Sequence, residues 1–205
     1  MDAAAVFSHL QTRYGDAVKD FTPSGTPGGP RDPYCKVVPE RWREVAQALR
    51  DDEPLRFDFL QCVTAVDWPK QSILQVVYHL FSYPHRHSFV VKADLPRETP
   101  VIPSVADLWG SAEWNEREQF DLLGVGFSGH PDLRRVMLPD DWVGHPLRKD
   151  WKEPAKYRDM PTTRPSPLDL LLLYDKAPDE KKHLRIVTGE GAEAPDEAEA
   201  TDAAD

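Results

Sequence analysis

Three apolar runs that follow one another closely constrain the fold of this chain more than any other feature. The runs are Phe57 to Val66, Ile73 to Phe81 and Ser88 to Leu95. In the middle run every even-numbered residue from 74 to 80 is apolar, which is the period of a strand with one buried face. The residues of that face are Leu74, Val76, Tyr78 and Leu80. We therefore expect three neighbouring strands in one sheet.

Two amphipathic segments and two shorter apolar segments precede these strands. Apolar residues recur at helical spacing from Ala3 to Tyr14, with Gly15 placed to end a helix, and again along one face from Trp42 to Leu49. Short strands are expected at Val18 to Phe21 and at Tyr34 to Val38, separated by a loop rich in proline and glycine. This order predicts an α+β fold. It is a two-layer domain in which a mixed β-sheet carries helices on one face (α-β2-α-β3), followed by a further helix and an extended C-terminal arm.

The further helix is expected to begin near Ser104. Ser104 to Asp107 has the composition of a capping box, and apolar residues from Val105 to Leu123 fall on one side of a helical wheel. Gly110 offers a point at which this helix could divide into two pieces.

Glu116 lies at the centre of the apolar stripe of that helix. A carboxylate that points at a core is costly unless it is paired and hydrogen-bonded. We therefore expect a buried ion pair with one of three arginines, namely Arg134, Arg135 or Arg148. A general acid or base is the alternative, but no nucleophile, metal cluster or phosphate-binding loop accompanies Glu116.

Other charged residues of the same helix are expected to point away from the apolar stripe. Arg117 and Asp121 are four residues apart, the spacing of an exposed helical pair or of a contact with a partner protein. Glu118 lies on the side opposite Glu116, and its removal should matter little to the fold.

Two Gly-His-Pro units follow, at Gly129 to Pro131 and at Gly144 to Pro146. Proline fixes its own φ and pushes the preceding residue toward extended geometry, so each unit predicts a rigid turn. The imidazoles of His130 and His145 are then free to bond backbone groups. Zinc ligation is the alternative, but the nearby aspartates show no metal-ligand spacing.

Composition limits the chemistry that this chain can support. The formal net charge is −10, and no basic stripe predicts a nucleic-acid partner. The two cysteines, Cys35 and Cys62, stand alone. One run, Gly124 to Gly129, has the spacing Gly-x-Gly-x-x-Gly, but it follows an expected helix and not a strand, so it is not a dinucleotide-binding fingerprint. We therefore expect no catalytic centre, iron-sulfur cluster, metal site, flavin or nicotinamide site in this chain.

The stretch from Glu116 to Trp151 resembles the signature of the thirty-kilodalton subunit of respiratory complex I, in its bacterial form. The matching elements are Glu116-Arg117-Glu118, Asp121-Leu122-Leu123-Gly124, Phe127, Gly129-His130-Pro131, Arg134-Arg135, Leu138-Pro139 and Gly144-His145-Pro146-Leu147-Arg148-Lys149-Asp150. The resemblance is sharp from about Ser104 to Trp151 and is one of pattern only from Val6 to Leu95.

This resemblance implies a cofactor-free structural subunit of the peripheral arm of proton-translocating NADH:quinone oxidoreductase. Its partners would be the quinone-site subunit of the forty-nine-kilodalton type and the subunit with the terminal iron-sulfur cluster. The holoenzyme would hold the FMN, the iron-sulfur clusters and the quinone. The chain would lie at the cytoplasmic side of the inner membrane, or the matrix side in mitochondria, and reach the membrane only through partners. A homologous subunit of a membrane-bound hydrogenase or related quinone reductase is the closer alternative, and an independent metal or acid-base enzyme the more distant one.

The residues after the signature are expected to lack a core of their own. The expected divisions are a domain over 1–150, a proline-rich interaction arm over 151–187 and a disordered acidic tail over 188–205. The tail carries seven Asp/Glu and no Lys or Arg. The apolar cluster from Leu168 to Leu173 is interpreted as a contact with the domain or with a neighbouring protein.

Overall fold

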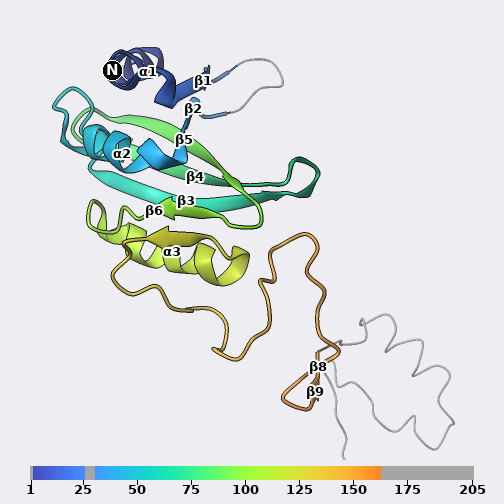
Figure 1. The fold of residues 1–205 in the computed structure, drawn as a ribbon. Helices are drawn as coiled ribbons and strands as arrows, with labels where there is room; N and C mark the ends of the chain where they lie inside the picture. Colours follow the sequence, from blue (N-terminus) through green and yellow to red (C-terminus); the bar gives the residue numbers. More distant parts are fainter. Residues whose placement is uncertain (1, 26–30, 163–205) are drawn as a thin grey trace, which may run out of the picture. The chain divides into compact units, whose positions relative to one another are not determined.

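A computed structural model describes residues 2–25 and 31–162 of the chain (Figure 1). The chain divides into two compact units, Met1–Lys152 and Glu153–Asp205. In the described part of the second unit, β8 (Lys156–Tyr157) and β9 (Met160–Pro161) form an antiparallel pair. The cluster from Leu168 to Leu173 and the acidic tail lie outside the described residues.

From Ala3 to Pro96 the first unit has the predicted order of helices and strands. Its elements are α1 (Ala3–Tyr14), β1 (Val18–Thr22), β2 (Tyr34–Val37), α2 (Trp42–Asp51), β3 (Phe59–Trp68), β4 (Ile73–Ser82), β5 (His87–Pro96), β6 (Val101–Pro103), α3 (Gly110–Leu123) and β7 (Gly126–Ser128). The predicted α+β class and the order α-β2-α-β3 are thereby confirmed.

Five strands form one mixed sheet in the order β1-β2-β5-β4-β3. The β2–β5 pair is parallel and the other pairs are antiparallel. The apolar face of this sheet packs against the helices, and the indole of Trp42 on α2 lies 4.2 Å from the ring of Tyr78 on β4. Both side chains are fully buried. Figure 1 shows α1 beside β1 and α3 at the opposite side, beside β3.

Side chains near and within α3 bind backbone groups of β3 and of the residues just before it. Gln119 accepts a hydrogen bond from the amide of Ala65 (3.0 Å), and Ser111 donates to the carbonyl of Leu60 (2.8 Å). The indole of Trp109 donates to the carbonyl of Phe57 (2.8 Å). Because an edge strand otherwise presents unpaired donors and acceptors, these bonds give α3 a fixed position against β3.

The helix that was expected from Ser104 begins only at Gly110. Ser104 does not cap a helix: its hydroxyl donates to Glu116 and accepts from the amide of Ala106, and the chain from Ser104 to Leu108 forms a turn. The short parallel pair of β6 and β7 that flanks α3 was not predicted. Each of these strands has three residues, which is too short to show a period of two.

Candidate interaction site on helix α3 and the loop after β7

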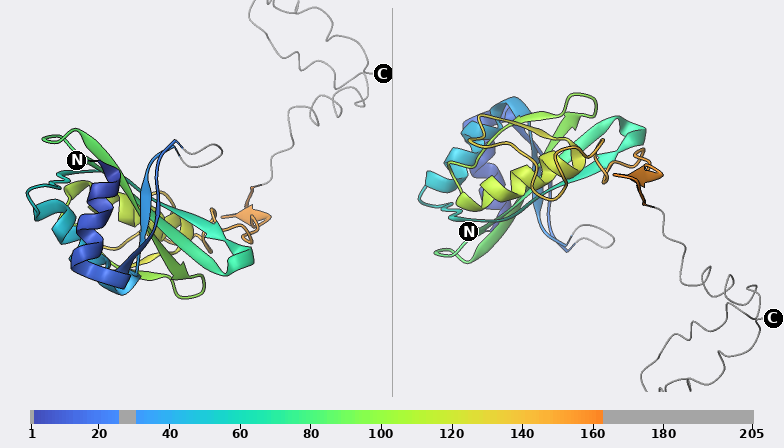
Figure 2. Two further views of the ribbon diagram at one scale, coloured as in Figure 1. Left: turned by 90° about the horizontal axis from the view of Figure 1, so that it is seen from above. Right: turned by 90° about the horizontal axis from the view of Figure 1, so that it is seen from below.

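The chain from Gly129 to Trp151 runs alongside α3 without helix or strand (Figure 2). It contains most of the residues that the sequence singled out. A few backbone bonds but no regular ladder hold this loop, so side chains satisfy many of its remaining polar groups. Three sets of side-chain bonds do so, and they fix the loop to the domain.

Asp121 of α3 makes the first set. Its carboxylate, fully buried, accepts a hydrogen bond from Arg135 (2.8 Å) and from three successive backbone amides, those of Val136 (3.0 Å), Met137 (2.8 Å) and Leu138 (2.9 Å). Burial alone would raise the pKa of Asp121, but these donors outweigh burial and hold the pKa below its ordinary value. The carboxylate therefore stays ionised and organises the loop around itself.

The end of α3 makes the second set. His145 donates through Nδ1 to the carbonyl of Asp121 (2.9 Å), and Arg148 donates through Nε to the carbonyl of Leu123 (2.7 Å). The helix ends at Gly124, where φ is +74°. A Cβ atom at this position would lie 2.6 Å from the imidazole of His145, so both the conformation and the contact require glycine.

Arg97, just after β5, makes the third set. It binds Asp67 of β3 through two bonds (2.7 and 2.9 Å) and Asp150 through two more (2.6 and 3.2 Å). Asp67 also accepts from the amide of Lys149 (2.8 Å). The bond from Arg97 lowers the pKa of Asp67 in spite of burial. The sequence did not single out Asp67 or Arg97. The available signal was an aspartate directly after the apolar run from Phe57 to Val66.

Glu116 is buried as predicted, but the predicted arginine partner was wrong. Its side chain is 0% exposed and accepts hydrogen bonds from the hydroxyl of Ser104 (2.6 Å) and the amide of Val105 (2.9 Å). The nearest basic group among the described residues is His130, whose Nε2 lies 3.9 Å away. Burial raises the pKa of Glu116 to about 7. The arginines expected as partners bind other groups: Arg134 pairs with Asp132, and Arg135 and Arg148 make the bonds given above.

Arg117 and Asp121 do not form the exposed pair that their spacing suggested. Arg117 is 4% exposed, donates to the carbonyl of Arg134 (3.3 Å) and lies over the ring of Trp114. The prediction failed because the loop covers the side of α3 that faces away from the sheet. Glu118 is half-buried and makes no hydrogen bond or ion pair with the described residues.

Both histidines of the Gly-His-Pro units bond backbone groups, as predicted. The Nδ1 atom of His130 accepts from the amide of Asp132 (3.1 Å), so its Nε2 atom donates to the carbonyl of Glu113 (3.1 Å). His130 is therefore neutral in this arrangement. Within 2–25 and 31–162, no three His, Cys, Asp or Glu side chains are grouped to hold a metal ion.

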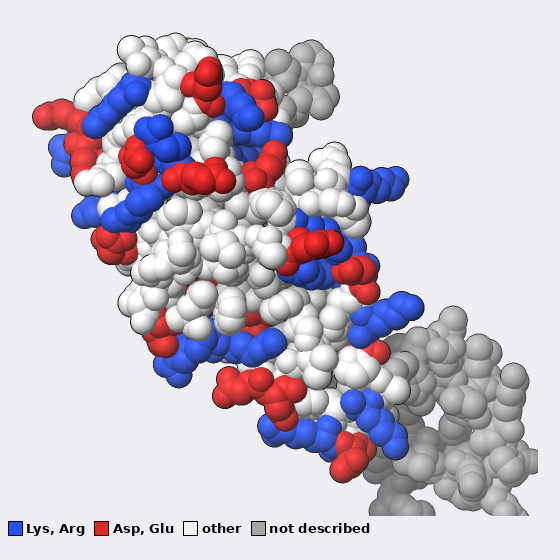
Figure 3. Space-filling view, in the orientation of Figure 1, with Lys and Arg blue, Asp and Glu red and all other residues white. Residues whose placement is uncertain are grey.

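The loop and the adjacent part of α3 expose large apolar side chains. We call this set the apolar loop surface; it comprises Trp114 (59% exposed), Val136 (38%), Met137 (62%), Val143 (79%) and Leu147 (54%). Charged side chains of both signs are interspersed on the face of the molecule in Figure 3, with an uncharged area between them. Exposed apolar side chains on a well-anchored loop are typical of a surface that contacts another protein.

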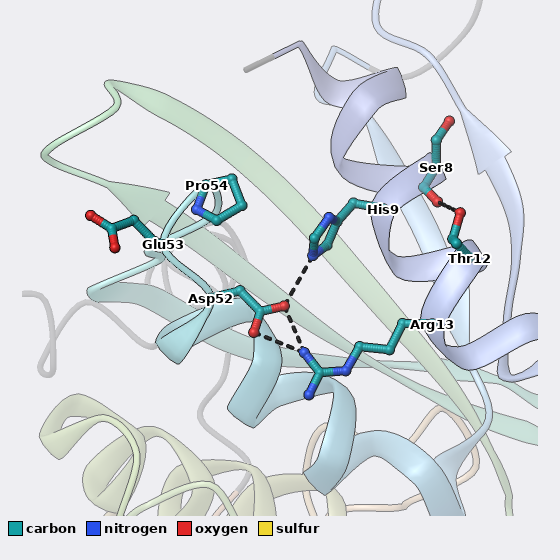
Figure 4. Close-up of a pocket in the computed structure, with 7 residues that line it drawn as sticks. All are labelled: Ser8, His9, Thr12, Arg13, Asp52, Glu53 and Pro54. Atoms are coloured by element: carbon teal, nitrogen blue, oxygen red, sulfur yellow. Dashed lines mark hydrogen bonds and ion pairs between the residues drawn. The ribbon is translucent and has the colours of Figure 1, made fainter.

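A shallow pocket between α1 and the end of α2 is a second place where polar side chains gather (Figure 4). His9 and Arg13 of α1 both point to Asp52, at 3.0 and 2.8 Å. Ser8 points away from His9 and donates to the carbonyl of Ala4 (2.9 Å). The residues lining this pocket thus place no nucleophile beside His9, and the cluster joins α1 to the rest of the domain.

Residues 35–157 match the family described as "Respiratory-chain NADH dehydrogenase, 30 Kd subunit". The chain belongs to this family. The resemblance stated from the sequence is thereby confirmed. Among the residues that the structure describes, no helix is long and apolar enough to cross a membrane.

Curated relatives are named as the C subunit of NADH-quinone oxidoreductase. The protein from Chloroherpeton thalassium is 41% identical over 150 residues, which are 72% of this chain and 60% of the relative. The protein from Chlorobium phaeobacteroides is 39% identical over 157 residues, which are 76% of this chain and 92% of the relative. The chain therefore spans about three fifths of the first relative's length and nearly all of the second.

Two solved structures share the fold. A trypsin-resistant fragment of Nqo5 is 31% identical with a TM-score of 0.52, and the similarity covers 65% of this chain and all of the fragment. A chain of the membrane-bound sulfane sulfur reductase, an archaeal respiratory membrane complex, is 24% identical with a TM-score of 0.59. That similarity covers 73% of this chain and 85% of the other, and it concerns the fold alone.

Proposed function

We propose that this chain is the thirty-kilodalton-type subunit of a proton-translocating NADH:quinone oxidoreductase and acts as a structural part of its peripheral arm. The observation that supports this role is the apolar loop surface, which buried charged groups hold in place. Such a surface can dock on another protein with little loss of conformational entropy, because the loop is already ordered. Membership of the family supplies the complex in which the docking would occur.

The proposed partners are the quinone-site subunit of the forty-nine-kilodalton type and the subunit with the terminal iron-sulfur cluster. In this proposal the chain lies on the cytoplasmic side of the membrane and reaches it only through these partners. The holoenzyme transfers electrons from NADH through FMN and iron-sulfur clusters to quinone. The chain would hold the two neighbouring subunits in fixed relative positions, since a displacement of about 1 Å can lower a catalytic rate a hundredfold.

We further propose that the chain itself carries no electron carrier and no catalytic group. Burial raises the pKa of the Cys35 thiol to about 12, which disfavours the thiolate that a cluster would need. Burial, with a smaller contribution from the nearby Glu118, also raises the pKa of Cys62. Metal analysis of the pure chain tests this part of the proposal, and stoichiometric iron or zinc would contradict it.

Charge substitutions on the apolar loop surface test the docking role. Met137→Glu and Leu147→Glu should leave the circular dichroism of the pure chain unchanged, because both side chains point to solvent. In the cell, native gels of solubilised membranes should show less assembled complex, and NADH-to-quinone activity should fall with it. Tyr83→Glu is the matched control, because Tyr83 is 61% exposed in the turn after β4. Normal assembly of both loop variants would contradict the docking role.

The parent complex could instead be a membrane-bound hydrogenase or a related quinone reductase. The fold that this chain shares with a chain of the sulfane sulfur reductase keeps this alternative open. Purification of the native complex followed by peptide identification separates the two, because only the NADH-linked complex contains a flavin subunit that oxidises NADH. An independent acid-base enzyme is less well supported, since Glu116 is fully buried and bound by the chain's own donors.

A further inference from the structure

Glu116 joins two parts of the domain that are separate in sequence. It belongs to α3, and both of its hydrogen-bond donors, Ser104 and Val105, belong to the turn that leads from β6 toward α3. The hydroxyl of Ser104 also accepts from the amide of Ala106 (3.1 Å), so this turn is built around the carboxyl group. Opening the turn would bring Glu116 into contact with water.

The charged and titratable groups that face Glu116 do not neutralise it. His130, from the loop after β7, uses both ring nitrogens for backbone bonds and is neutral. Tyr78 of β4 is fully buried, and burial together with Glu116 raises its pKa, so it is also neutral. Arg43 of α2 is already bound through two bonds to Asp107. The closed turn therefore encloses a carboxyl group without a free cation beside it among the described residues.

Such an enclosure favours the neutral acid, because the charged form loses its hydration without gaining a counter-ion. The protonated group keeps one carbonyl oxygen to accept from Val105, and its hydroxyl oxygen can still bond Ser104. Ionisation leaves the same contacts but places a charge in the core.

We propose that Glu116 is a proton-binding latch. In its protonated form it holds the turn from Ser104 to Leu108 closed against α3, and loss of the proton to solvent favours opening of that turn. Because α3 anchors the apolar loop surface, the latch links the pH to how rigidly that surface is held. The latch is a property of this chain alone and does not depend on the identity of the parent complex.

Hydrogen exchange of the Val105 amide in the full 205-residue chain tests the latch. This amide can exchange only after its bond to Glu116 breaks. After correction for the intrinsic exchange rate, its protection should fall about tenfold per pH unit between pH ~5 and ~7 and then level off, because the open state releases one proton. In Glu116→Gln, which has the same shape and no titration, this contribution to the slope should disappear.

Two comparisons make the test decisive. The amide of Tyr78, in a central strand, should exchange only on global unfolding, so low urea should raise its exchange rate strongly. The amide of Val105 should exchange through local opening of the turn, so low urea should raise its exchange rate only weakly. Two results would overturn the latch. One is an equal urea dependence of exchange at Tyr78 and Val105, and the other is an equal pH dependence of Val105 protection in wild type and Glu116→Gln. If the variant fails to fold, carbon-13 titration of Glu116 in the wild-type chain decides: a midpoint near 7 supports the proposal, and one near 4.5 refutes it.

Discussion

Removal of the Asp121 carboxylate should destabilise the domain more than removal of any exposed carboxylate. Asp121→Ala leaves the half-buried Arg135 without its counter-ion, bound only to the carbonyls of Trp142 and Gly144. It also leaves three backbone amides without their acceptor. Breaking one side of a buried pair costs about 3–5 kcal/mol. Arg135 is 18% exposed and the loop can admit some water, so we expect about 4 kcal/mol, a large fraction of the stability of a domain of this size.

Urea denaturation followed by circular dichroism measures this loss. Asp121→Asn keeps an acceptor but not the charge, so it should lose about 2 kcal/mol. Asp132→Ala is the control, because Asp132 pairs with Arg134 in an exposed position, where solvent screens the pair, so its loss should be much smaller than that of Asp121→Ala. Because the pKa of Asp121 is lowered, its contribution should be complete above pH ~4 and disappear in stronger acid. If Asp121→Ala costs no more than Asp132→Ala, the carboxylate does not organise the loop.

Three further predictions concern other parts of the domain. Gly124→Ala should cost at least about 1 kcal/mol by urea denaturation, and His145→Ala in the same chain should recover part of that loss by removing the clash at 2.6 Å. The raised pKa of Glu116 means that the folded state holds this proton more tightly than the unfolded state does. The free energy of unfolding, measured by urea denaturation, should therefore fall by about 3 kcal/mol as pH rises from ~4.5 to ~7. Glu116→Gln should abolish this fall. Asp52→Asn should cost about 1 kcal/mol at low salt and less in ~1 M NaCl, because it removes a partly exposed pair with Arg13; a loss that salt leaves unchanged would contradict the ionic origin.

The sequence predicted the sheet and its helices well because each has a long, regular pattern of burial. The three long strands and both N-terminal helices were recognised from periods of 2 and 3.6 residues. The wheel also placed Glu116 correctly, at 0% exposure. These successes depend on local geometry, which the spacing of apolar residues encodes directly.

The partners of the buried charges could not be predicted in the same way. A helical wheel shows which side of α3 is apolar, but it does not show that the turn from Ser104 folds back onto Glu116. Nor does it show that a loop without periodicity covers Arg117 and Asp121, so these residues were wrongly expected to be exposed. Arg97 binds both Asp67 and Asp150 and so joins three segments that are distant in sequence. No spacing within one segment indicates such bonds.

The amides that bind Asp121 belong to the backbone. The bonds that hold the loop in place therefore do not depend on which side chains the loop carries. Every residue except proline supplies the same N–H group, so the side chains at Val136, Met137 and Leu138 can change without removing any bond to the carboxylate. Evolution or design could therefore exchange the exposed side chains of Val136 and Met137 while Asp121 and Arg135 keep the loop in place. Proline at 136, 137 or 138 would remove one of these bonds and so damage the scaffold itself.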